Sequence, residues 1–93
     1  MNNTYVLYAK LRYICENVNE LHILLLCKIL NDLTKKIEVK ISPLLLKDYK
    51  IALDELYYET IFSNYKNMKS INNMIYIISI IMIELHRQLL YYL

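Results

Sequence analysis

The stretch SPLLLKDYKIALDELYYETIFSNY (residues 42–65) carries the clearest helix signal in this chain. Ser42 is a residue type that caps helix N-termini, and Pro43 suits the first helical position, where its missing N–H has no partner to lose. The apolar residues that follow recur every three or four positions and form one stripe: Leu45, Leu46, Tyr49, Ala52, Leu53 and Leu56. This period predicts an amphipathic helix from Pro43 to about Tyr65.

The whole chain contains no glycine and only one proline among its 93 residues. Phosphate-binding loops, dinucleotide fingerprints and the sharp turn of a hydrolase nucleophile all depend on glycine, so these function classes are excluded. Tight hairpin turns also favour glycine because they need positive φ angles. We therefore expect an all-α fold in one domain, residues 1–93, built as a three- or four-helix bundle with short polar turns.

The N-terminal third has a heptad-like pattern that runs from Leu7 to Leu25 with spacings of four and three. This pattern predicts one long helix over residues 4–34. The alternative is a break near Asn17–Asn19, where the residue types favour a turn and Asn19 would cap a second helix. The wide apolar face of this region is typical of a core helix in a bundle.

The remaining segments predict one extended piece and one last helix. Residues 36–41 alternate polar and apolar side chains, as a short strand does. A polar turn follows at 64–73, and Ser70 then caps a helix that reaches about Tyr92. The apolar run 74–83 is too short to span a membrane by itself, so we expect a helix buried on every side and no membrane partner.

Composition and charge favour an intracellular protein that works in contact with other chains. The hydrophobic fraction is 57%, which is more than a small monomer easily hides. The net charge of +2 is too mild for binding nucleic acid by charge alone. Cys15 and Cys27 are expected to be reduced buried thiols, and the N-terminus carries no secretory signal. Heavy use of Ile, Asn, Lys and Tyr is typical of an AT-rich genome, which suggests a viral protein inside a host cell.

No arrangement of residues predicts catalysis. Glu20 and His22 lie two positions apart, as do Glu84 and His86, and residues with that spacing point to different faces of a helix. The spacing of the cysteines and histidines does not match a zinc site. Glu55 and Glu59 share a face, but a solvated acidic surface is the commoner role for such a pair. We expect no enzyme activity, no cofactor, no metal and no small-molecule substrate.

The ten tyrosines are the most unusual positive feature of the chain. A tyrosine combines a large apolar ring with a polar tip, which suits a subunit interface. The pairs Tyr57-Tyr58 and Tyr91-Tyr92 are each expected to direct one ring to the core and one outward, so these four residues are the predicted interface anchors. The favoured function is a helical interaction protein that acts as an oligomer or as a subunit of a larger assembly.

The segment Lys36-Ile37-Glu38-Val39-Lys40-Ile41-Ser42-Pro43, followed by two predicted helices, resembles the ribbon-helix-helix family of DNA-binding repressors. The resemblance implies a strand at 36–41 that pairs with a second chain, followed by helices 43–65 and 70–92. It also implies that Lys36, Glu38 and Lys40 face the bases, and that the helix N-terminus at Ser70 holds a phosphate.

A third function stays open because basic residues are scattered along the first half of the chain. A small helical subunit of a ribonucleoprotein complex would use them along the nucleic acid: Lys10, Arg12, Lys28, Lys35 and Lys36.

Overall fold

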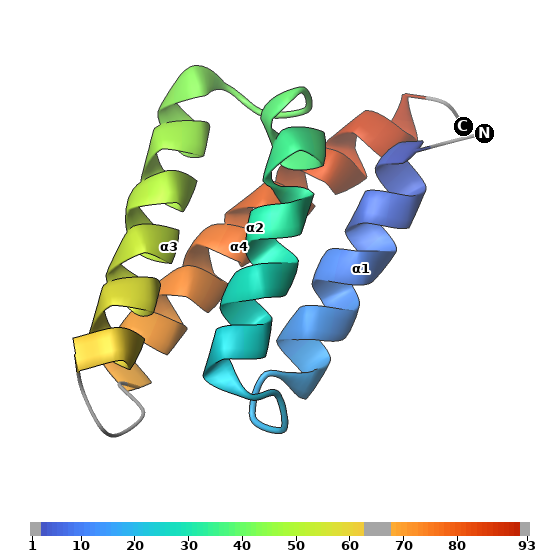
Figure 1. Cartoon of the computed structure of the whole chain (residues 1–93). Helices are drawn as coiled ribbons and strands as arrows, with labels where there is room; N and C mark the ends of the chain where they lie inside the picture. The colour runs from blue at the N-terminus through green and yellow to red at the C-terminus, as the bar shows by residue number, and fades with distance from the viewer. Residues whose placement is uncertain (1–2, 63–67, 92–93) are drawn as a thin grey trace.

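The protein consists of four helices in the computed structural model, which describes residues 3–62 and 68–91 (Figure 1). They are α1 (Asn3–Asn17), α2 (Ile23–Glu38), α3 (Pro43–Phe62) and α4 (Met68–Leu90). No strand occurs within the described ranges. The prediction of an all-α bundle is therefore confirmed, with four helices rather than three.

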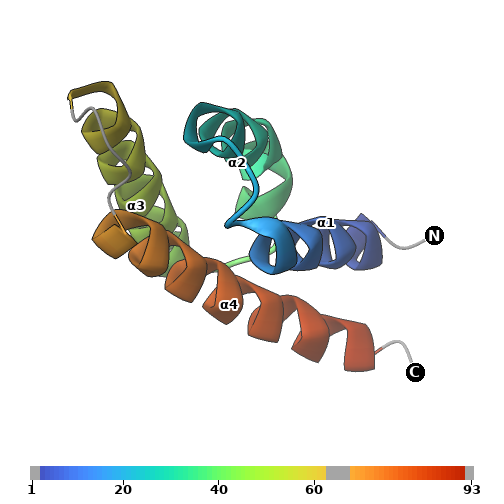
Figure 2. The ribbon, with the colours of Figure 1, turned by 90° about the horizontal axis from the view of Figure 1, so that it is seen from below.

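The helices form a ring in which each packs on two neighbours. Helix α4 contacts both α3 and α1, and α2 contacts the same two helices from the other side. Viewed along the bundle, α4 forms a base that crosses α3 and α1, and α2 lies over them (Figure 2). Within the described residues, the backbones of α1 and α3 do not approach each other closely, and neither do those of α2 and α4.

The core is filled by aliphatic side chains from all four helices and by one tyrosine. Tyr49 is fully buried, and its hydroxyl donates a 2.6 Å hydrogen bond to the backbone oxygen of Leu30. This bond ties α3 to α2 and satisfies a polar group that would otherwise be costly to bury. The largest fully buried side chains among the described residues are Leu11, Ile14, Leu26, Leu30, Ile37, Tyr49, Leu56, Ile71, Met74, Ile78, Ile81 and Leu85.

Helix α3 begins as the sequence predicts. The backbone N–H of Leu45 donates a 3.2 Å hydrogen bond to the Ser42 hydroxyl oxygen, which is the predicted N-cap contact. The predicted inward stripe is also largely correct, since Tyr49, Ala52 and Leu53 are buried. The helix ends at Phe62, and the residues predicted to complete it lie outside the described part of the chain.

The prediction of one long helix over residues 4–34 is wrong. The chain leaves the helix after Asn17, whose side-chain amide donates to the Tyr13 backbone oxygen at 2.8 Å. A new helix then starts with His22 as its N-cap, because the Leu24 N–H donates to His22 Nδ1 at 3.2 Å. The break allows α1 and α2 to fold back and bury both apolar faces, which one straight helix cannot do.

The predicted strand at 36–41 is also absent. Lys36, Ile37 and Glu38 form the last turn of α2, and residues 39–42 form the connection to α3. Ile37 is fully buried, but Val39 is 75% exposed, so the alternation does not reflect a two-sided strand. None of the described turn residues has a positive φ, which fits a chain without glycine.

Two expectations for the last helix are corrected. Ser70 lies inside α4, which starts at Met68, and it is buried there with its hydroxyl hydrogen-bonded to the Glu59 carboxylate. The apolar run 74–83 is not buried on every side, because Tyr76 is exposed and Ile83 is 70% exposed. By length and composition α4 could cross a membrane from Lys69 to Leu90, a test that core helices of soluble proteins also pass.

Candidate interaction surfaces

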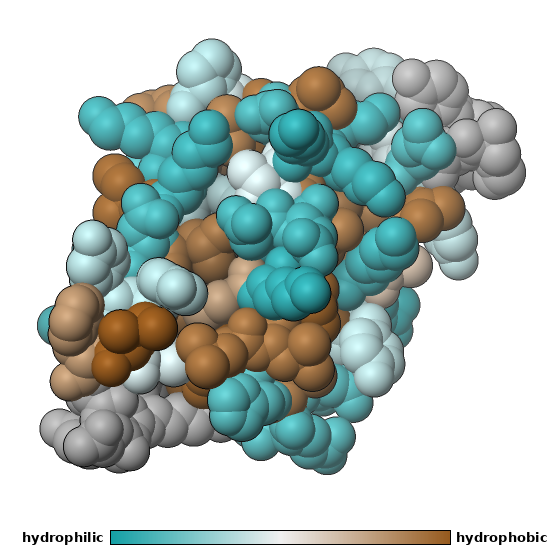
Figure 3. All heavy atoms as spheres, viewed as in Figure 1, coloured by the Kyte–Doolittle hydropathy of each residue, from teal (hydrophilic) through white to brown (hydrophobic). Residues whose placement is uncertain are grey.

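The solvent-facing sides of the helices carry many large apolar residues, several of which form clusters on the surface. In the view of Figure 3, hydrophobic residues form a band across the lower part of the face, where α2 begins and α3 ends. Four residues at the end of α3, which we name the α3 end cluster, are all exposed: Tyr57, Tyr58, Ile61 and Phe62. The Tyr58 and Phe62 rings stack with centroids 5.7 Å apart, one helical turn from each other.

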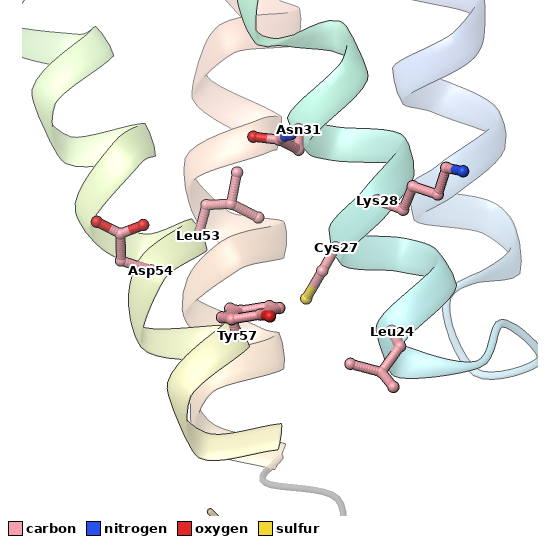
Figure 4. A pocket seen from close by; sticks show the side chains of 7 residues that line it. All are labelled: Leu24, Cys27, Lys28, Asn31, Leu53, Asp54 and Tyr57. Atoms are coloured by element: carbon pink, nitrogen blue, oxygen red, sulfur yellow. The ribbon is translucent and has the colours of Figure 1, made fainter. Parts of the chain in front are cut away.

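A pocket of about 420 Å³ opens between α2 and α3 beside this cluster. Figure 4 shows the Tyr57 ring, the Cys27 thiol and the Leu24 side chain directed into the space between the two helices, while Lys28 extends away from it. Leu53 and Asn31 complete the inner wall, and Asp54 lies on α3 at the rim. Burial raises the pKa of the Cys27 thiol, which disfavours the reactive thiolate form.

A second groove of about 530 Å³ runs between α1 and α2. Its lining is mostly apolar, with one lysine on the α1 wall and one aspartate on the α2 wall: Tyr5, Val6, Ala9, Lys10, Tyr13, Ile14, Ile29, Asp32 and Leu33. Tyr5, Ala9 and Tyr13 are spaced by four and therefore share one exposed side of α1. We name this surface the α1–α2 groove.

Three lysines meet next to this groove, where α1 passes the end of α2. Lys10 of α1, Lys36 of α2 and Lys40 of the following turn line one hollow of about 290 Å³. The position of Lys40 is fixed from α4, because the Gln88 side-chain amide donates a 2.6 Å hydrogen bond to the Lys40 backbone oxygen. We name these three residues the lysine hollow. It brings together lysines that are 30 positions apart in the sequence.

Helix α4 has an exposed apolar line of its own. Tyr76, Ile83 and Leu90 recur every seven residues and all face solvent, opposite the side that packs in the core. A seven-residue repeat keeps the three side chains on one face of the helix. Tyr91 follows at the end of this line and is 78% exposed.

The predicted tyrosine anchors lie on the surface but not as paired inward and outward rings. Tyr57 and Tyr58 are 50% and 62% exposed, so neither ring enters the core. They point to adjacent sides of α3 because consecutive helical residues are rotated by 100°. Tyr92 lies outside the described residues. The structure therefore places Tyr57 and Tyr58 in the α3 end cluster and Tyr91 at the far end of α4.

The residues assigned to DNA by the ribbon-helix-helix resemblance are not arranged as that family requires. Glu38 closes the last turn of α2, Ser70 is buried within α4, and the segment between Lys36 and Lys40 is a helix end. Without a strand to pair between two chains, no ribbon forms from residues 36–41. Only Lys36 and Lys40 remain together, and they do so in the lysine hollow.

The histidines and Cys15, whose side chains could in principle serve as bases, nucleophiles or metal ligands, make structural contacts instead. His22 caps α2, and the His86 ring packs against Tyr8 with centroids 6.1 Å apart. The Cys15 thiol contacts the Met82 sulfur at 3.9 Å between α1 and α4, and burial raises its pKa. In the described part of the chain, no three His, Cys, Asp or Glu side chains come together as metal ligands would.

The sequence singled out Tyr57 and Tyr58 at the end of α3, although one of the two rings was expected in the core, and it gave no prediction of the α1–α2 groove. The sequence did contain a signal for this groove, because Tyr5, Ala9 and Tyr13 recur every four residues. They form a second side of α1, next to the heptad residues that pack in the core. Searches of protein families, curated proteins and solved structures found no match to this chain.

Proposed function

We propose that this chain is a non-enzymatic interaction protein that assembles, with copies of itself or as a subunit beside other chains, through its exposed apolar and tyrosine-rich helix faces. The α3 end cluster carries this proposal. Aromatic anchors beside a pocket are typical of the few residues that supply most of the binding energy at protein interfaces. The proposal also places the chain inside the cell, where Cys15 and Cys27 stay free.

The amount of exposed surface supports this proposal. A compact folded monomer of 11.2 kDa exposes about 5,700 Å² by the usual scaling with mass. The chain exposes 6417 Å², and many large hydrophobic side chains contribute to that surface. Apolar area that stays in contact with water is a source of binding free energy when a partner covers it.

The test is the mass of the protein in solution, measured by sedimentation over micromolar to millimolar concentrations. We expect the wild-type mass to rise above 11.2 kDa with concentration. The double variant Tyr58→Ser/Phe62→Ser should weaken association about tenfold or more, since it removes a stacked aromatic pair without touching the core. The matched control is Lys47→Ser/Asp48→Ser, which removes two exposed side chains on the same helix and keeps the net charge.

Two results would contradict the proposal together. One is a wild-type mass of 11.2 kDa over the whole range, which removes self-association. The other is the absence of any cross-link from a photoreactive phenylalanine analogue at position 62, tested in the cells that make the protein. The second result would remove the subunit form of the proposal.

The lysine hollow favours a second candidate, a subunit that contacts nucleic acid. Lys10, Lys36 and Lys40 come from separate parts of the chain and could contact neighbouring phosphates. Binding to single-stranded and duplex RNA and DNA should then weaken steeply with salt, and each Lys→Ala variant should lower the salt slope by about one. The candidate would be rejected if the wild type and the triple variant Lys10→Ala/Lys36→Ala/Lys40→Ala bound nucleic acid equally well and without dependence on salt.

A further inference from the structure

We infer that the α1–α2 groove is the contact between two copies of this chain, which meet groove to groove about a two-fold axis that runs along the groove. This inference rests on the proposed function and specifies its partner and its surface. The α3 end cluster lies on another side of the bundle, beside the pocket between α2 and α3, where it would join such dimers into larger assemblies.

The first argument is the chemistry of the lining. Seven of the nine lining residues are apolar or tyrosine, and the two charged ones sit on opposite walls. Interface cores are depleted in charge and enriched in tyrosine, as this groove is. The pocket between α2 and α3 is smaller, at about 420 Å³ against about 530 Å³, and has three polar residues among seven.

The second argument is the placement of the two charges. Lys10 is on the α1 wall and Asp32 is on the α2 wall, and both side chains are exposed. The ion pairs found in the described residues join Arg12 to Glu16 and Arg87 to Glu84, so they leave Lys10 and Asp32 available. A groove with opposite charges on its two walls is complementary to a second copy of itself.

The charges also select the direction of the axis. If the axis ran across the groove, α1 of one copy would face α1 of the other, and Lys10 would face a second Lys10. If the axis runs along the groove, α1 of each copy lies over the partner's α2, and Lys10 of each copy faces the partner's Asp32. Only the second arrangement brings opposite charges together, and it does so twice because of the symmetry.

A contact of ordinary size would cover only a small part of the exposed surface. A standard specific interface buries about 800 Å² on each partner. This is about one eighth of the 6417 Å² that the chain exposes, so the contact would extend beyond the groove lining over neighbouring exposed residues of α1 and α2. The tyrosines at positions 5 and 13 would provide large rings at the centre of the contact.

The experiment is charge complementation between two single variants, Lys10→Asp and Asp32→Lys. The first has two acidic residues in the groove and the second has two basic residues. Each alone should dimerise about tenfold or more weakly than wild type, because like charges face each other at two places. Mixed in equal amounts, the two should form a heterodimer near wild-type affinity, since each charge then faces its opposite. Native mass spectrometry separates the heterodimer from both homodimers, and far-UV circular dichroism checks that each variant is folded.

The matched control is the same exchange across the other pocket, Lys28→Asp and Asp54→Lys, which should leave dimerisation unchanged. The inference is overturned if Lys10→Asp and Asp32→Lys each dimerise as wild type does, or if mixing them restores nothing. It is also overturned if complementation appears only for the control pair. If the wild type still self-associates in these cases, the proposed function stands and only the groove-to-groove contact is rejected. If the wild type stays monomeric but a cross-link forms at position 62, again only the groove-to-groove contact is rejected. A monomeric wild type without that cross-link would reject both the contact and the proposed function.

Discussion

Among the described tyrosines Tyr49 is the one that is fully buried, and its hydroxyl is a polar group that must be satisfied for α3 to pack on α2. Replacing it with phenylalanine keeps the ring and removes the 2.6 Å hydrogen bond to the Leu30 oxygen. We expect Tyr49→Phe to lower the free energy of unfolding by about 1 kcal/mol, measured by urea denaturation. Tyr76→Phe, on the exposed side of α4, is the control and should change it by less than about 0.5 kcal/mol.

Burial of the same hydroxyl makes stability depend on alkaline pH. Burial raises the pKa of Tyr49 from 10.0 to about 12. The unfolded chain therefore loses this proton at lower pH than the folded chain does. The contribution of Tyr49 is fully present below pH 10 and is lost as the pH rises through 12, by about 2–3 kcal/mol. Because other tyrosines and lysines titrate in the same range, the measurement is the difference between wild type and Tyr49→Phe across this window. Parallel curves for the two proteins would show that burial does not hold the Tyr49 proton.

At the scale of the helix, the start of α3 depends on its cap. Ser42→Ala removes the hydroxyl that accepts the Leu45 N–H and should cost about 1 kcal/mol of unfolding free energy. Ser42→Asp supplies another acceptor and a negative charge at the positive end of the helix dipole, so it should retain the wild-type value or exceed it. An equal loss in both variants would show that Ser42 acts through something other than capping.

Helix α4 allows a direct comparison of its two apolar sides. Ile78 is fully buried and Ile83 is 70% exposed, although both lie in the same isoleucine-rich run. Ile78→Ala should cost about 2–5 kcal/mol because it leaves a cavity in the core. Ile83→Ala should stay within about 0.5 kcal/mol in dilute solution. Similar losses at the two positions, measured by urea denaturation, would mean that the outer side of α4 is also covered.

The sequence predicted a helix correctly where local signals agreed. In α3 the cap at Ser42, the proline after it and the apolar stripe all specify the same start and the same buried side. Near Asn17 the signals conflicted, because a heptad pattern continued through residues that favour a turn. The turn formed, and the break lets α1 pack mainly on α4 while α2 packs mainly on α3.

The candidate surfaces were harder to predict than the helices. The sequence singled out Tyr57 and Tyr58 as interface residues, but the expectation that one of the two rings enters the core is wrong, because both are exposed. The α1–α2 groove depends on which helices become neighbours and on the break at residues 18–22, and no periodicity specifies either. The alternation of polar and apolar residues at 36–41 led to the wrong prediction of a strand. The end of a helix can also place a single apolar side chain, Ile37, in the core.

At the scale of the whole molecule, association should appear in thermal unfolding. A protein that unfolds from a dimer becomes more stable as its concentration rises. For a chain of this length we expect the Tm of wild type to increase by about 3–5 °C for each tenfold increase in concentration. Lys10→Asp should have a lower Tm than wild type at each concentration, because its dimer is about tenfold or more weaker, and Lys28→Asp should behave as wild type. A wild-type Tm that is independent of concentration would contradict association in the folded state.

The ring of helices has a consequence for how the protein comes apart. Each helix gains its apolar contacts from two neighbours, and the described backbone shows no close approach across either diagonal. Unfolding of any one helix therefore removes a packing partner from both of its neighbours and exposes their apolar side chains to water. The three remaining helices should then be unstable, so the slowest amide hydrogens in all four helices should exchange through one cooperative unfolding of the whole bundle rather than helix by helix.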